Sequence, residues 1–179
     1  SLMHSAAKRE KERNFVGSDR ATKDVKQLLD FYDVLVCGDG ELAIFEALKI
    51  DKGVVDADDR KSPLFLSNKQ FTNFPMPARH LVDVGSYKYQ IEGEDAVSLI
   101  AQLGCPFFCT FCSGRNSPFL RKIRTRGTDS VIKEIEHLHL EYGFKGFMFY
   151  DDELNVNKNM VSMMNQISDL QEKHGVAFK

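Results

Sequence analysis

The sequence has no long apolar run, no excess of charge of one sign and few cysteines, and each of these absences excludes a class of protein. No apolar stretch approaches the roughly 20 residues that a membrane-spanning helix needs. A net charge of −2 argues against a general nucleic-acid binder, whose surface would be basic. The first residues lack the apolar core of a signal peptide. We therefore expect a cytoplasmic protein with neither a membrane nor a nucleic acid as partner.

Only four cysteines occur, and three of them lie together at Cys105, Cys109 and Cys112. A secreted disulfide framework would spread its cysteines along the chain. Three crowded thiols in a sequence without a signal peptide instead indicate metal binding in a reducing compartment.

The chain of 179 residues divides by composition into four predicted segments. Residues 1–24 are a polar N-terminal segment. Residues 25–50 contain a strand over 33–37, a tight glycine turn and a helix over 42–50, which is one unit of a parallel α/β sheet. Residues 51–95 are a linker followed by a hairpin, which we expect over 82–92 with its turn at Gly85 and Ser86.

Residues 96–179 alternate between strand and helix patterns. We expect strands over 96–103, 145–150 and 176–178, and helices over 128–142 and 157–174. Thr128 or Asp129 is the expected N-cap of the first helix, and Gly143 and Gly175 are expected to end the two helices. This order predicts the opening of a parallel β/α barrel, but a closed one needs about 200 residues.

The three clustered cysteines have the spacing Cys-x3-Cys-x2-Cys, which lets their thiolates reach one metal centre. A cube of four irons held by three cysteines keeps one iron without a protein ligand, so that a cofactor can bind there. The competing readings are a zinc site, which normally needs four ligands, and three inert cysteines in a protein core.

This spacing, with the aromatic Phe111 directly before the last cysteine, resembles the signature of the radical S-adenosylmethionine (SAM) superfamily. The motif also follows a predicted strand that opens a β/α barrel, which is its place in that superfamily. The resemblance implies a [4Fe–4S] cluster on Cys105, Cys109 and Cys112, and a partial radical SAM barrel of the TIM type.

The preceding residues are similar to the subfamily that carries a cobalamin-binding domain before the barrel. The similarity lies in residues 33–41, with their Gly-x-Gly-Glu turn, and in the proline-rich 74–79. It implies the tail of a Rossmann-like domain, with cobalamin as a candidate cofactor. The sequence has Cys37 where the subfamily usually has a basic residue, and it lacks the Asp-x-His-x-x-Gly motif that donates a histidine to cobalt. Most of such a domain is therefore absent from this chain.

The resemblance implies that the protein cleaves SAM reductively and starts radical chemistry on a substrate, with cobalamin-dependent methyl transfer as one reaction. A flavodoxin or ferredoxin would supply the electron. Phe111 would flank the adenine of SAM, and Asp151, Asp152 and Glu153 would meet its ammonium group. The alternative for these three acids is a helix N-terminus, and the alternative for the protein is a non-catalytic iron–sulfur or zinc module.

A basic stretch follows the cysteines, and one of its side chains could meet a carboxylate or phosphate, although a solvated loop is the alternative. It consists of Arg115, Arg121, Lys122, Arg124 and Arg126. With its barrel incomplete, the chain alone is expected to be inactive.

Overall fold

The computed structural model describes residues 27–112, 114, 116–117 and 119–179. The predicted segment 1–24 and Arg115 lie outside these residues. By contacts the chain forms two compact units, one of residues up to Ser67 together with Gly104–Ile123, and one of Asn68–Leu103 together with Arg124–Lys179. This division differs from the four predicted segments, which remain a prediction.

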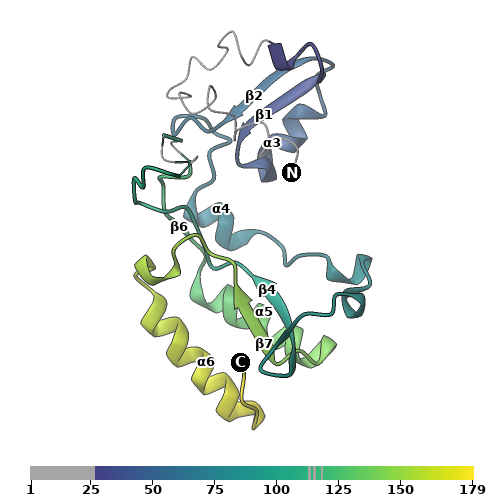
Figure 1. The fold of residues 1–179 in the computed structure, drawn as a ribbon, viewed down its shortest axis with the longest axis vertical. Helices are drawn as coiled ribbons and strands as arrows, with labels where there is room; N and C mark the ends of the chain where they lie inside the picture. The colour runs from purple at the N-terminus through teal and green to yellow at the C-terminus, as the bar shows by residue number, and fades with distance from the viewer. Residues whose placement is uncertain (1–26, 113, 115, 118) are drawn as a thin grey trace. The chain divides into compact units, whose positions relative to one another are not determined.

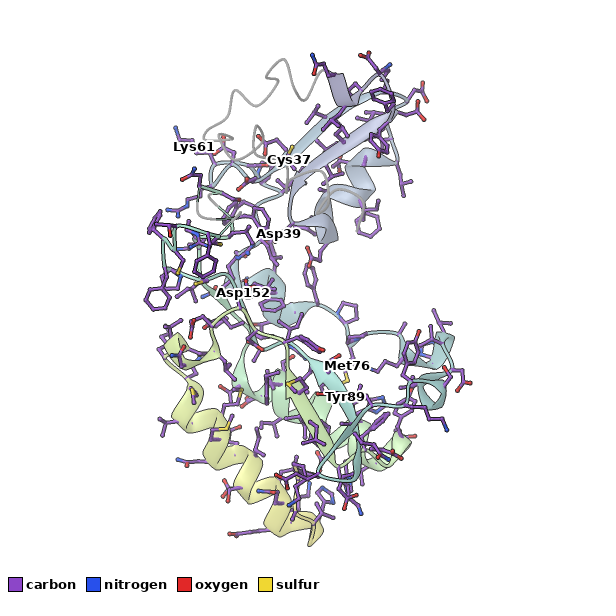
Figure 2. All side chains as sticks on the ribbon, in the orientation of Figure 1. Cys37, Asp39, Lys61, Met76, Tyr89 and Asp152 are labelled. Atoms are coloured by element: carbon purple, nitrogen blue, oxygen red, sulfur yellow. The ribbon has the colours of Figure 1, made fainter. Side chains whose placement is uncertain are left out.

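The first unit is built on a parallel β–α–β arrangement (Figure 1). Strand β1 (Val34–Gly38) pairs with β2 (Gly53–Ala57), and helix α3 (Gly40–Ala47) connects them. Cys37 lies on β1 and Asp39 directly follows it, as Figure 2 shows. The predicted strand, turn and helix of this segment are confirmed, although α3 begins two residues earlier than expected.

Helix α3 packs through small residues rather than through its large apolar ones. Ala43 and Ala47 are buried against Val55 and Ala57, whereas Phe45 is 62% exposed. Alanines let the helix approach the two-stranded sheet closely.

The second unit contains a three-stranded sheet in the order β3–β4–β7. Its members are β3 (Gln90–Ile91), β4 (Glu94–Leu99) and β7 (Gly146–Phe149), and β4 runs parallel to β7. A separate two-residue ladder joins β5 (Gln102–Leu103) to β6 (Arg124–Thr125). The helices are α4 (Asn68–Asn73), α5 (Thr128–Tyr142) and α6 (Met160–His174), with 3₁₀ turns η2 (Arg79–Leu81), η3 (Val84–Ser86) and η4 (Leu154–Val156).

Helices α5 and α6 cover one face of the β4–β7 pair and form the core of this unit. The buried residues of that core come from the end of β4 and from both helices: Leu99, Ala101, Val131, Ile135, Met163 and Leu170. Strand side chains alternate between faces, so the paired Ser98 and Met148 lie on the opposite, exposed face. The amphipathic pattern of the two helices therefore predicted that each packs through an apolar face, although Val161 and Met164 are exposed and Met163 is the buried methionine of α6.

Four details of the predicted elements are wrong. The hairpin turn is at Glu92 and Gly93, both with positive φ, whereas Gly85 and Ser86 lie in η3. The N-cap of α5 is Gly127, in place of Thr128 or Asp129. The second helix begins at Met160, after η4, and the first strand ends at Leu99. Gly143 and Gly175 do end α5 and α6, in left-handed conformation, as expected.

The predicted strand over 176–178 is not formed, but Lys179 begins to pair with β7. Its amide N–H donates to the carbonyl of Lys145 at 2.8 Å, and its carbonyl accepts from the amide of Phe147 at 2.8 Å. One residue bonded to i−1 and i+1 of its neighbour is the pattern of a parallel ladder. Lys179 thus makes the hydrogen bonds of a parallel strand with β7.

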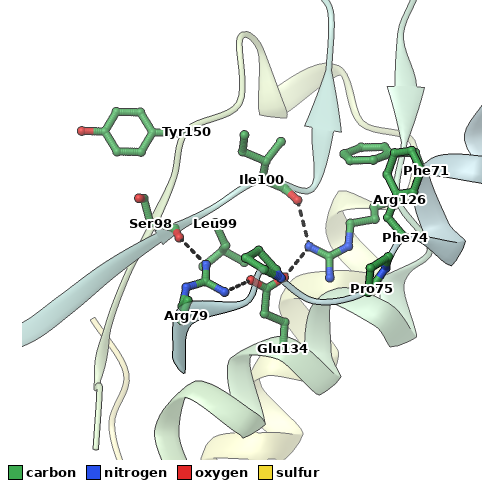
Figure 3. Close-up of a pocket in the computed structure, with 11 residues that line it drawn as sticks. Phe71, Phe74, Pro75, Arg79, Ser98, Leu99, Ile100, Arg126, Glu134 and Tyr150 are labelled. Carbon is green, nitrogen blue, oxygen red and sulfur yellow. Dashed lines mark hydrogen bonds and ion pairs between the residues drawn. The ribbon is translucent and has the colours of Figure 1, made fainter. Parts of the chain in front are cut away.

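A buried carboxylate ties the proline-rich linker to α5 (Figure 3). Glu134 is 1% exposed, and its two oxygens accept from Arg79 at 2.6 Å and Arg126 at 2.5 Å. The same two guanidiniums also donate to main-chain carbonyls at the end of β4, Arg79 to Ser98 and Arg126 to Ile100. We call these three side chains the Glu134 clamp.

No helix in the described part of the chain is long and apolar enough to cross a membrane.

We predict that Glu134→Gln lowers the free energy of unfolding by about 3–5 kcal/mol, because it leaves two largely buried cations without their carboxylate. Chemical denaturation followed by circular dichroism measures this. Glu46→Gln is the matched control, since Glu46 pairs with Lys49 on the surface of α3 and should cost less than about 1 kcal/mol. Equal costs for the two substitutions would contradict the clamp.

Candidate metal centre

The three clustered cysteines lie at the start of a long loop, Gly104–Ile123, which belongs to the first compact unit. Two backbone hydrogen bonds shape the loop where the thiols are. The amide of Cys105 donates to the carbonyl of Leu120 at 2.9 Å, and this bond closes the base of the loop. The amide of Cys112 donates to the carbonyl of Cys109 at 3.1 Å, and this bond forms a turn. We call this segment the cysteine loop.

Gly104 permits the close approach of the two sides of the loop. Its φ is +85°, and a Cβ at this position would stand 2.9 Å from the carbonyl carbon of Lys122 and closer still to its oxygen. Real Cβ atoms do not approach backbone so closely, and side chains other than glycine disfavour this φ. The backbone geometry therefore requires glycine at position 104.

Asp58 anchors the returning half of the cysteine loop to the end of β2. Its carboxylate is 3% exposed and accepts from the hydroxyl of Ser117 at 3.0 Å and from the amide of Phe119 at 2.7 Å. No sequence signal pointed to this residue. Nothing in a charged linker distinguishes the one aspartate that becomes buried.

The donor chemistry of the loop fits an iron–sulfur cluster. Cys105 and Cys112 are half-buried and Cys109 is exposed, and none of them forms a disulfide. Across the residues described, no three potential metal-ligating side chains are drawn together. Three thiols on one short loop are nevertheless the ligand type and number that such a cluster takes when one iron stays open.

The aromatic residues of the loop face solvent. Phe107, Phe108 and Phe111 are 48%, 66% and 87% exposed, so these rings do not cover the thiols. Phe111, the residue expected to flank adenine, offers an open ring face.

The basic stretch after the cysteines has several different roles. Arg124 is buried, Arg126 belongs to the Glu134 clamp, and Lys122 is exposed. The guanidinium of Arg121 lies 3.9 Å from the sulfur of Cys112.

The three predicted acidic residues lie in the second unit, after β7. The carboxylate of Asp151 accepts from the amide of Ala101 at 3.2 and 3.3 Å, and burial raises the pKa of this carboxyl. Asp152 is exposed (Figure 2), and the main-chain carbonyl of Glu153 accepts from the amide side chain of Gln102 at 2.7 Å. Asp151 therefore ties β7 to the chain after β4.

A pocket of about 450 Å³ lies at the same end of the parallel strands β4 and β7 (Figure 3). The Glu134 clamp forms one side, and the linker aromatics Phe71 and Phe74 form another. Ligand sites of parallel α/β folds lie at the carboxyl ends of strands. The sequence predicted a linker over these residues and did not predict a pocket.

No family model matches the chain, but several curated proteins do. It is 31% identical over 142 residues to an uncharacterized methyltransferase of Pyrococcus horikoshii, covering 70% of this chain and 29% of that protein. It is 28% identical to the anaerobic magnesium-protoporphyrin IX monomethyl ester cyclase of Cereibacter sphaeroides, covering 80% and 26%. A cytidylyl-2-hydroxyethylphosphonate methyltransferase of Streptomyces wedmorensis is 29% identical, covering 56% and 20%.

A solved structure is also similar, the radical SAM methyltransferase TsrM of Kitasatospora setae with cobalamin and a [4Fe–4S] cluster bound. The sequence identity is 21% and the TM-score 0.38, covering 45% of this chain and 14% of that one.

The three curated relatives are named as enzymes. Two of them are methyltransferases and one is a cyclase. The predicted resemblance is confirmed, and the chain is related to these curated enzymes. It spans 20–29% of the length of the three relatives named.

We predict that Gly104→Ala destabilises the protein by more than the about 1–2 kcal/mol that a left-handed residue costs, because the methyl group also meets the backbone of Lys122. Denaturation measures the cost. Gly93→Ala is the matched control, since its φ is +84° and nothing lies within 4 Å of its Cβ. Equal costs would show that the contact is unimportant.

We also predict the sign of a pH effect at Asp151. Its raised pKa means that the folded state holds the proton more tightly than the unfolded state, so ionised Asp151 costs stability. The stability of the wild type relative to Asp151→Asn should therefore fall as pH rises from the ordinary value of 3.8 through the folded pKa. Denaturation midpoints at a series of pH values test this, and a relative stability that rises over that range would contradict it.

Proposed function

We propose that the chain is the cluster-binding part of a radical SAM methyltransferase, with Cys105, Cys109 and Cys112 holding a [4Fe–4S] cluster. The observation that carries the proposal is the spacing of the three thiols on one loop whose base is closed at Gly104. The relatives favour methyl transfer as the reaction class, because two of the three curated relatives are named as methyltransferases.

We further propose that β4–α5–β7–α6 opens a β/α barrel. The parallel pairing of β4 with β7, helices on one face and the ladder bonds of Lys179 all support this. In such a barrel the next parallel strand would join β7 at the edge that Lys179 already occupies.

A cluster held by Cys105, Cys109 and Cys112 would supply the electron for reductive cleavage of SAM. The chain's own residues bind and orient. The exposed ring of Phe111 would stack on adenine, and the carboxylates of Asp152 and Glu153 would accept hydrogen bonds from the ammonium group. Asp151 would have a structural role instead, because its carboxylate already accepts a hydrogen bond from the backbone amide of Ala101.

Two partners belong to the proposal for the whole protein. An external donor of the flavodoxin or ferredoxin type would reduce the cluster. Cobalamin would be the methyl carrier, bound mainly by residues that this chain does not contain, because no Asp-x-His-x-x-Gly motif is present.

Anaerobic reconstitution with iron and sulfide tests the assignment. The wild type should bind about four irons per chain, and SAM should change the electron paramagnetic resonance (EPR) spectrum of the reduced cluster. Cys105→Ser, Cys109→Ser and Cys112→Ser should each lose most of the iron, whereas Cys37→Ser should keep it. Stoichiometric zinc in place of iron, or undiminished iron in Cys105→Ser, would refute the proposal in favour of a zinc module or inert cysteines.

A further inference from the structure

Buried polar atoms without a hydrogen-bond partner are rare among the described residues, and most of them belong to one side chain. They are the Oε1 of Gln102 and the Nε and Nη1 of Arg121. A buried donor without an acceptor costs free energy, so two on one guanidinium require an explanation.

Arg121 lies against the sulfur of Cys112. Its Nη2 is 3.9 Å from that Sγ, and the centre of its guanidinium is 5.7 Å from the ring centroid of Phe108. In the part of the chain that the structure describes, no carboxylate forms an ion pair with Arg121. The cysteine loop therefore holds a cation whose nearest recorded polar contact is a thiol.

A neutral thiol is a weak acceptor and carries no charge to balance a guanidinium. A metal-bound thiolate carries negative charge, and a reduced iron–sulfur cluster carries one more. The unfilled donors of Arg121 thus match an anionic centre on this loop better than they match free cysteines.

We propose that Arg121 is a positioning residue of the metal centre, whose charge and N–H groups stabilise the reduced cluster. This rests on the proposed [4Fe–4S] assignment. Net charge and hydrogen bonds to the sulfurs set the reduction potential of such clusters. Arg121 therefore makes the one-electron reduction of the cluster easier, with the electron coming from an external reductant and no bond forming or breaking.

The test uses the reconstituted full chain, titrated with dithionite at controlled potential and followed by EPR. Arg121→Met should lower the ratio of reduced to oxidised cluster about tenfold at a fixed potential, which is about 59 mV for one electron. Arg121→Lys keeps the charge but loses the planar fork, so it should shift the ratio less. Lys122→Met is the matched control, because it removes one positive charge from an exposed side chain of the same loop.

The proposal is overturned if Arg121→Met titrates like the wild type, or if Lys122→Met shifts the ratio as far. Loss of iron from Arg121→Met that Arg121→Lys restores also supports the role, because a side chain that only stacks on Phe108 would not need its charge. Failure of the wild type to bind iron would instead refute the metal assignment itself.

Discussion

One carboxylate taken out of water holds the second unit together. Glu134 is buried on α5, and burial of a lone charge would cost more than most single contacts return. Arg79 and Arg126 offset that cost from opposite sides, and each then donates to the backbone at the end of β4. The position of the linker, the ends of the strands and the wall of the pocket all follow from this one charge.

The sequence predicted the elements whose pattern is local. Helices α5 and α6 have apolar residues at helical spacing and glycines where they end, and both were placed within three residues. Where the prediction went wrong, distant packing or turn geometry decided. The hairpin turns at Glu92 and Gly93 because both residues adopt positive φ there.

The same distinction applies to the candidate centre. The cysteine spacing predicted three metal ligands, and that assignment stays a prediction, whereas the resemblance that the spacing carried is confirmed by the relatives. The anchors of the loop and of the linker could not be predicted, since Asp58 reaches Phe119 across 61 positions and Arg79 reaches Glu134 across 55. Such contacts depend on how distant segments come together in the fold. The sequence has no periodic pattern at these positions that would predict which segments meet. Arg121 stood in a basic stretch where no local feature separated it from its neighbours.

The ladder between β5 and β6 has a consequence for how the centre is built into the protein. Leu103 and Arg124 are paired across the strands, so the chain leaves and re-enters the second unit at adjacent points. The residues between Leu103 and Arg124 form an insert whose two ends are held side by side by the β5–β6 pairing. Such an insert tolerates exchange of its contents, because the scaffold's own path is unchanged when the insert is replaced. The same pair of short strands, β5 and β6, could therefore close a loop of other length and other chemistry in place of the cysteine loop.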